Sequence, residues 1–283
     1  MHVAEAKVWR LAMTRPEWQA AGEVDPRALG EARGQAQNAV HWLARLAHSY
    51  REPEPERRHV LLSFDAARRA FVTQPFADGV TVEVRLPALE MQFREGDRLV
   101  PHVLAVEGHS PAKVEAWVLV ELLHRGIDRD RFSKTLPYDA QNLMTGDTVE
   151  YSPETCAKEL DELAQWLGNA GAVLGQLGNA MSADGVTPGL VCWPEQFHVG
   201  MTIPVEPDGA VSDKALRVGL SAGDERYAEP YFFVAVQSRG EIETPHPGSV
   251  VTASRVVADK LTADDVVGML RSAIATTRKR VSN

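Results

Sequence analysis

Apolar residues recur at helical spacing in four stretches of the chain, and each stretch has a recognisable start. Asp25-Pro26, Ser110-Pro111 and Ser152-Pro153 each place a capping side chain directly before a proline, the usual order at the first turn of a helix. The fourth stretch begins at Thr262 and keeps its apolar residues on one side. The pattern therefore predicts about four long helices.

Two other regions alternate apolar and polar residues at every second position, which is typical of strands. The first runs from His59 to Leu99, where turn-like residues separate short alternating runs, and it predicts an antiparallel meander. The second follows Gly185 and continues to about Gln237. This order of elements predicts an α+β fold in which antiparallel sheet packs with the helices. We expect a single domain over residues 1–283, with 52–58 and 183–190 as the places where it would divide.

The composition predicts a soluble, cytoplasmic protein that binds neither nucleic acid nor membrane. The 283-residue chain has a formal net charge of −9 and a pI near 5.5, whereas a phosphate-binding surface needs an excess of Lys and Arg. We find no apolar leader near the N-terminus, and the apolar stretch 116–123 is too short to span a bilayer. Cys156 and Cys192 lack metal-ligand spacing and are expected to be reduced thiols.

The segment from Trp193 to Val236 places polar and small residues on one face of the predicted sheet. If residues 196–202 are extended, Gln196 and His198 project away from a row of apolar side chains. Glycine and serine on the neighbouring strands leave room there for a ligand or for a close approach of backbones. A histidine in such a place can titrate near neutral pH or coordinate a metal. This face is therefore the predicted binding site.

Three further patterns have both a functional and a purely structural interpretation. Residues 219–223 match the GxSxG pattern of a nucleophile elbow, but no helix fits before the next strand, so we expect a hairpin connection. Asp224, Glu225 and Glu229 can hold a cation or form a solvated acidic turn, and we favour the turn. His41 lies in the first helix, where a lone histidine is usually a surface or core residue.

The predicted site resembles a bacterial family of uncharacterised proteins that is classed as a domain of unknown function. Its members carry a Trp-Pro-x-His-Phe-Asp stretch and, further on, Ser-Pro-Gly-Asp-Glu followed by Glu-Pro-Tyr. The counterparts here are residues 193–198 (Trp-Pro-Glu-Gln-Phe-His), 221–225 (Ser-Ala-Gly-Asp-Glu) and 229–231 (Glu-Pro-Tyr). This chain has Gln196 and His198 where the family has His and Asp. The resemblance therefore implies a shared fold and segment, and it does not imply a reaction.

The main functional hypothesis is a small-molecule-binding protein, which can also be an enzyme, with a pocket beside the 193–236 sheet. His198 and Gln196 would be its polar contacts, and Trp193 and Tyr231 its walls. The rim would carry Asp224 and Glu225, with His41 as an additional contact.

Two alternatives belong to other classes of protein. The first is a structural or partner-binding protein, for example a homodimer, because six tryptophans suit interfaces as well as cores. The second is a metal-dependent hydrolase, although no metal site is assigned from the sequence. Its ligands would have to converge from His198, Asp224, Glu225 and His41.

Overall fold

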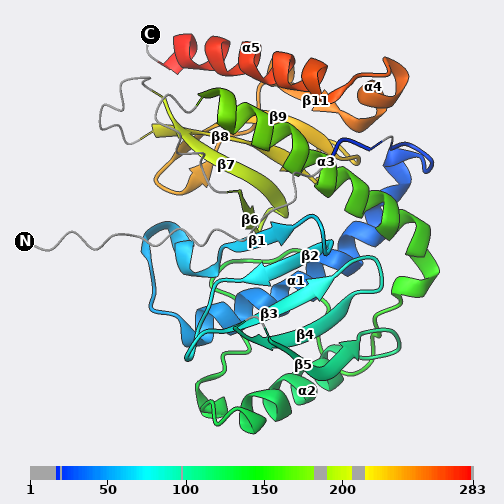
Figure 1. Cartoon of the computed structure of the whole chain (residues 1–283), viewed down its shortest axis with the longest axis vertical. Coiled ribbons are helices and arrows are strands. Elements are labelled where there is room, and N and C mark those ends of the chain that lie inside the picture. The colour runs from blue at the N-terminus through cyan, green and yellow to red at the C-terminus, as the bar shows by residue number, and fades with distance from the viewer. Residues whose placement is uncertain (1–16, 20, 97, 182–189, 206–213, 282–283) are drawn as a thin grey trace, which may run out of the picture.

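The computed structural model describes residues 17–19, 21–96, 98–181, 190–205 and 214–281 (Figure 1). The first half of the chain runs from a short 3-10 turn, η1 (Pro26–Leu29), into helix α1 (Gly30–Tyr50). Asp25 caps this start, because its carboxylate accepts a hydrogen bond of 3.0 Å from the N–H of Arg27. The helix ends before the proline-rich stretch that begins at residue 52.

Five antiparallel strands and a second helix follow α1. After the 3-10 turn η2 (Pro55–Val60) come β1 (Leu62–Asp65), β2 (Ala70–Thr73), β3 (Val80–Arg85), β4 (Glu90–Glu95) and β5 (Arg98–Ala105). Helix α2 (Pro111–His124) begins at Ser110, whose hydroxyl accepts a hydrogen bond from the N–H of Lys113. The long connection after α2 contains one short 3-10 turn, η3 (Arg129–Arg131).

The second half of the chain repeats this order of elements. It consists of η4 (Pro153–Cys156), α3 (Ala157–Met181), β6 (Val191–Trp193), β7 (His198–Pro204), β8 (Lys214–Ser221), β9 (Tyr231–Ser238) and β10 (Glu241–Ile242). It closes with η5 (Pro247–Ser249), β11 (Val250–Thr252), α4 (Ala253–Ala258) and α5 (Ala263–Val281). Both halves therefore place a five-stranded meander after a long helix and before a further helix, and the second half adds β11 and α4 before α5.

The described strands form one antiparallel sheet in the order β10-β9-β8-β7-β6-β1-β2-β3-β4-β5. The two meanders meet at β1 and β6, the first strand of each, which pair through Leu62 and Cys192. From this seam the strand order runs outward in the same way on both sides. At the far edge both β10 and β11 pair with β9. β11 pairs with the first residues of β9, and β10 pairs with its last residues.

A layer of three helices covers one face of the sheet (Figure 1). α1 contacts β2 and β3, α3 contacts β7 and β8, and α5 contacts β9, while α3 touches both other helices. Alternate residues of the strands, such as Val82, Val199 and Val218, face this layer and are fully buried. The remaining residues of each strand face the other side of the sheet.

The fold class predicted from the sequence is confirmed, with one antiparallel sheet and four long helices, α1, α2, α3 and α5. α1, which precedes residues 52–58, packs on strands that follow them, and residues 183–189 lie outside the described residues. None of the described helices combines the length and apolar character that a membrane crossing requires.

Candidate functional site

A cleft of about 390 Å³ lies on the sheet face that the helix layer leaves free. Outward-facing residues of four neighbouring strands line it: Trp193 on β6, Thr202 on β7, Arg217 on β8 and Gln237 on β9. Thr202 and Arg217 are direct partners in the β7–β8 register, so the alternation of the strands brings these side chains to one face. The walls are η2 and the turn at 194–197.

Arg217 is the most buried charged residue of this cleft, with 2% of its surface exposed. Its guanidinium carbon lies 4.0 Å from the centre of the Trp193 ring. Nε donates a hydrogen bond to Oε1 of Gln237 (3.0 Å), and Nη1 donates to Oε1 of Gln196 (3.3 Å). Burial lowers the pKa of Arg217 to about 10, against the opposing charges of Glu195 and Glu56. The side chain therefore remains a cation at neutral pH.

Of the residues predicted from the sequence, Trp193 and Gln196 line the cleft. Gln196 lies in a turn, because β7 begins only at His198, so the prediction of extended backbone is wrong at residues 196 and 197. Gln37 of α1 holds this turn by donating from Nε2 to the carbonyl oxygens of residues 194 and 195, at 3.3 and 3.0 Å. The turn brings the Gln196 carboxamide to Arg217.

The opposite wall, η2, contains two residues with left-handed backbone, Glu56 (φ 55°) and Arg57 (φ 56°). Neither is glycine, so each conformation is strained and persists because surrounding contacts hold it. Arg57 forms a 2.6 Å ion pair with Glu195, which belongs to the other wall. Oε2 of Glu56 accepts a hydrogen bond from Nε2 of Gln237 at 3.4 Å. Charged and polar groups therefore tie η2 to the rest of the cleft.

His41 does not line the cleft itself but contacts Tyr138, which does. Its Nδ1 is 3.0 Å from the hydroxyl of Tyr138, which lines the cleft, and 1% of His41 is exposed. Burial, together with the charge of Arg45, lowers the pKa of His41 to about 3. Burial also raises the pKa of Tyr138 far above its ordinary value. The pair is therefore neutral at physiological pH, and it supports the wall without carrying charge.

His198 does not line the cleft. It is 6% exposed, its ring centre lies 4.8 Å from that of Phe233, and its Nδ1 has no hydrogen-bond partner among the described residues. Burial and the charge of Arg217 lower the pKa of His198 to about 3, although Asp224 opposes this shift. The structure therefore does not favour titration near neutral pH, one of the two roles that the sequence allowed for His198, because a buried imidazole without a partner resists protonation.

Gly200 and Gly219 allow two strands to approach closely and do not leave room for a ligand. They are direct partners in the β7–β8 register. A Cβ atom at Gly200 would lie 2.3 Å from the carbonyl oxygen of Val218, and one at Gly219 would lie 2.5 Å from that of Val199. Of the two interpretations that the sequence allowed for these glycines, the close approach of backbones is confirmed.

Asp224 and Glu225 follow the C-terminal end of β8, and Tyr231 pairs with Ser221, the last residue of that strand; none of the three lines the cleft. Oδ1 of Asp224 accepts hydrogen bonds of 2.8 Å from the N–H groups of residues 226 and 227. Its Oδ2 accepts a 2.5 Å hydrogen bond from the hydroxyl of Tyr231. Glu225 is exposed. Asp224 and Tyr231 therefore organise a turn, and the expected pocket wall at Tyr231 and rim at Asp224 and Glu225 are not found in this cleft.

The GxSxG pattern at 219–223 lies in a connection between two strands, as the sequence predicted. Ser221 is the last residue of β8, and no helix occurs before β9 begins at Tyr231. The Ser221 side chain is buried, and its hydroxyl accepts a hydrogen bond from the N–H of Gly223. The hairpin connection is confirmed, and this serine is not exposed at a helix N-terminus as a nucleophile elbow requires.

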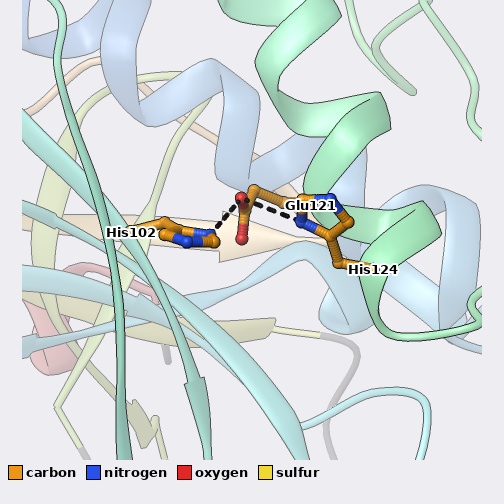
Figure 2. A group of neighbouring side chains, drawn as sticks. All are labelled: His102, Glu121 and His124. Carbon is orange, nitrogen blue, oxygen red and sulfur yellow. Dashed lines mark hydrogen bonds and ion pairs between the residues drawn. The ribbon is translucent and has the colours of Figure 1, made fainter.

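The ligands of the predicted metal-dependent hydrolase do not converge. The candidate ligands were His41, His198, Asp224 and Glu225. In the part of the chain that the structure describes, no three of these residues lie close enough to share an ion. The one group of ligand-type side chains found among the described residues is elsewhere, at His102, Glu121 and His124 (Figure 2).

The sequence prediction missed the residue that dominates the cleft. The signal for Arg217 was its place in the strand alternation, on the same face as Gly219 and Ser221. Tyr138 had no such signal, because it lies in a connection without hydrophobic periodicity. η2 had no such signal either, because its charged residues 56–58 lie between a proline-rich stretch and the alternating run that begins at His59.

Comparisons of this chain with protein-family models, with curated proteins and with solved structures find no match. The resemblance of residues 193–198, 221–225 and 229–231 to an uncharacterised bacterial family therefore stays a prediction. The functional argument rests on the geometry of the cleft.

Proposed function

We propose that this protein binds a small organic anion in the cleft, with the Arg217 guanidinium as the anchor for a carboxylate or phosphate group. The observation that carries this proposal is a buried cation that forms no salt bridge with any described residue, although the charges of Glu195 and Glu56 act on it from a greater distance. No carboxylate among the described residues lies within 4.0 Å of Arg217, and the groups that it contacts are two carboxamides and an indole ring.

A buried guanidinium without an ionic partner destabilises a folded protein, which is the physical reason to expect a ligand. Removing a cation from water costs on the order of several kcal/mol. Hydrogen bonds to Gln196 and Gln237 and the face of Trp193 offset part of this cost. An anion in the cleft would supply the missing charge.

The other charged residues of the cleft are already paired. Arg57 pairs with Glu195 at 2.6 Å, and Arg58 lies 3.7 Å from Glu56. Three arginines and two glutamates line the cleft, so a single positive charge remains, and Arg217 holds it. This balance favours a ligand with one anionic group.

The donors of Arg217 that point away from its present contacts define how such a ligand would bind. Nε and one N–H of Nη1 are occupied by the two glutamines. A guanidinium has further N–H groups on its two terminal nitrogens, which match the two oxygens of a carboxylate or phosphate. The volume of about 390 Å³ suits a compact metabolite.

The alternative of a partner-binding protein, such as a homodimer, has less support. Among the described residues, the exposed large apolar side chains are spread over a strand, two helices and a connection, namely Val103, Val120, Leu123, Val149 and Val257. Val120 and Leu123 share one face of α2, but such a pair, like single exposed apolar side chains, is normal on a monomer and is too small for an interface. The cleft therefore offers the better-supported function.

Binding of benzoate, succinate and inorganic phosphate to the purified chain tests the proposal, with benzamide as a neutral probe of the same shape as benzoate. We expect at least one of these anions to bind, to add about 2.7 kcal/mol to the free energy of unfolding at a hundred times its Kd, and therefore to raise the melting temperature. Benzamide should have no effect. Calorimetric titration then gives the affinity of the anion that binds.

The variant Arg217→Gln keeps a polar side chain and removes the charge. We expect it to lower the affinity for the anion at least about tenfold, because a charge-assisted pair is lost. Arg271→Gln, which removes an exposed arginine of α5, is the matched control and should bind as the natural chain does. Equal affinity of Arg217→Gln and the control, or no binding of any of the three anions, overturns the proposal.

A further inference from the structure

Two histidines and a buried glutamate come together on the surface where β5 meets α2 (Figure 2). His102 belongs to β5, and Glu121 and His124 belong to α2, where they are three residues apart. Residues at this spacing project from one face of a helix. The figure shows both imidazoles directed at the Glu121 carboxylate, one from the strand and one from the helix.

The distances in this group are those of a site that can hold a metal ion. Nδ1 of His102 is 3.0 Å from Oε1 of Glu121, and Nδ1 of His124 is 3.6 Å from the same oxygen. Ligand atoms about 2.1 Å from a tetrahedral zinc ion are separated by about 3.4 Å. All three ligand atoms lie within 4.8 Å of one another, so a small rotation of the imidazoles brings both to an ion beside Oε1.

The different burial of the Glu121, His102 and His124 side chains also suits metal binding. The Glu121 side chain is 3% exposed, whereas those of His102 and His124 are 55% and 53% exposed. The carboxylate is therefore fixed, and the imidazoles are free to adjust and to release an ion. His124 also lines a second cleft, which keeps the site accessible to solvent and small ligands.

Arg125 orients the carboxylate from behind. Its Nη1 is 2.8 Å from Oε2 of Glu121 and also donates to the main-chain oxygen of that residue, and its guanidinium lies over the ring of Phe93. Oε2 is thus occupied, and Oε1 is the atom turned to the two histidines. Hydrogen bonds that hold a ligating carboxylate in this way are a regular feature of metal sites.

We propose that His102, Glu121 and His124 form a binding site for a divalent transition-metal ion, with zinc as the ion that fits best. Two imidazoles and one carboxylate form a ligand set that zinc uses in proteins, with a fourth position left for water or another ligand. Magnesium favours oxygen ligands in octahedral geometry and does not fit this set. The site shares no residue with the lining of the Arg217 cleft. A failure of the anion-binding proposal would therefore leave the metal-site proposal unaffected, and the reverse also holds.

Zinc titration of the tag-free full-length chain against a competing chromophoric chelator tests this site. We expect one zinc ion per natural chain and no competition from magnesium. His102→Ala and His124→Ala should each weaken zinc binding at least about tenfold, and the double variant should abolish stoichiometric binding. Both histidines are half exposed, so these variants should fold, which circular dichroism verifies.

His246→Ala provides the matched control, because it removes an exposed histidine from another surface. It should bind zinc as the natural chain does. The proposal is overturned if the natural chain takes up no stoichiometric zinc, or if the double variant binds zinc as tightly as the control. The cobalt-loaded natural chain should also show d–d absorption bands that are absent from the double variant.

Discussion

Arg217 and His198 are both buried polar side chains, but only Arg217 borders open space. Both point to the sheet face away from the helix layer, and both are less than a tenth exposed. Arg217 lines the cleft, whereas His198 packs against Phe233 at the other end of β7. Strand alternation predicts the face on which a side chain lies. It does not predict which end of that face other segments cover, and for this reason the sequence prediction placed His198, and not Arg217, beside the open space.

The substitution Arg217→Met separates a ligand-binding role from a structural one. Methionine retains much of the aliphatic stem and needs no counter-ion, so we expect the free energy of unfolding to stay within about 1 kcal/mol of the natural value, or to rise. Denaturant unfolding measures this difference. A loss of about 3 kcal/mol would instead identify Arg217 as a residue that the fold itself requires.

His198 should make stability depend on pH in the acidic range. The pKa of His198 in the fold is about 3, below the value near 6.5 of an unfolded chain. The folded state therefore binds fewer protons, and the stability contribution is complete above about pH 6.5 and is lost as the pH falls toward about 3. Between about pH 6.5 and pH 5 the loss for this residue is about 2 kcal/mol.

The variant His198→Gln isolates this effect from other titrating groups. Denaturant unfolding at about pH 7 and at about pH 5 should give a smaller loss of stability for the variant than for the natural chain, by about 2 kcal/mol. Identical losses would show that His198 is not held neutral by burial.

At the scale of elements, the long periodic segments were predictable and the short ones were not. The starts of α1, α2 and α5 and the first meander follow the sequence pattern, because caps and alternation act locally. β10 and β11 have two and three residues, which is too few for a period to be recognised. The turn before β7 also escaped prediction, since Phe197 has a left-handed backbone (φ 53°) that its residue type does not suggest.

A charge network on the free face of the first meander stabilises β3 and β4. Glu83 is fully buried there and lies 2.7, 3.4 and 3.5 Å from arginines at 68, 85 and 94. We expect Glu83→Gln to lower the free energy of unfolding by about 1–3 kcal/mol, because several charge-assisted contacts lose their acceptor.

The control for this network is Glu90→Gln. Glu90 pairs with Arg85 at 2.9 Å, but its side chain is 39% exposed. An exposed pair contributes less than about 1 kcal/mol, so this variant should be close to the natural chain in denaturant unfolding. Equal losses for the two variants would contradict the assignment of Glu83 as the centre of the network.

At the scale of the whole molecule, two meanders share one sheet and one helix layer (Figure 1). The repeated order of helix, strands and helix was not evident in the sequence, because it is a repeat of elements and not of residues. The pairing of β1 with β6 joins residues far apart in the chain, and local patterns carry no information on such contacts. The cleft depends on this joint, since η2 precedes β1 and the opposite wall follows β6.

The charge of the cleft is opposite in sign to the net charge of the whole chain. The chain has a formal net charge of −9, whereas the residues that line the cleft carry a small positive balance. Under the proposed function, this local cation would favour a small anion that fits the cleft, whereas a nucleic acid needs a broad basic surface.

A crystal structure of the chain soaked with the anion that binds best in the screen tests the central claim most directly. The account predicts electron density in the cleft, with two oxygens of the anionic group within hydrogen-bond distance of the terminal nitrogens of Arg217 and with Trp193 and Gln237 still in contact with the guanidinium. Density for the anion at another surface, with Arg217 untouched and the cleft holding only water, would contradict it.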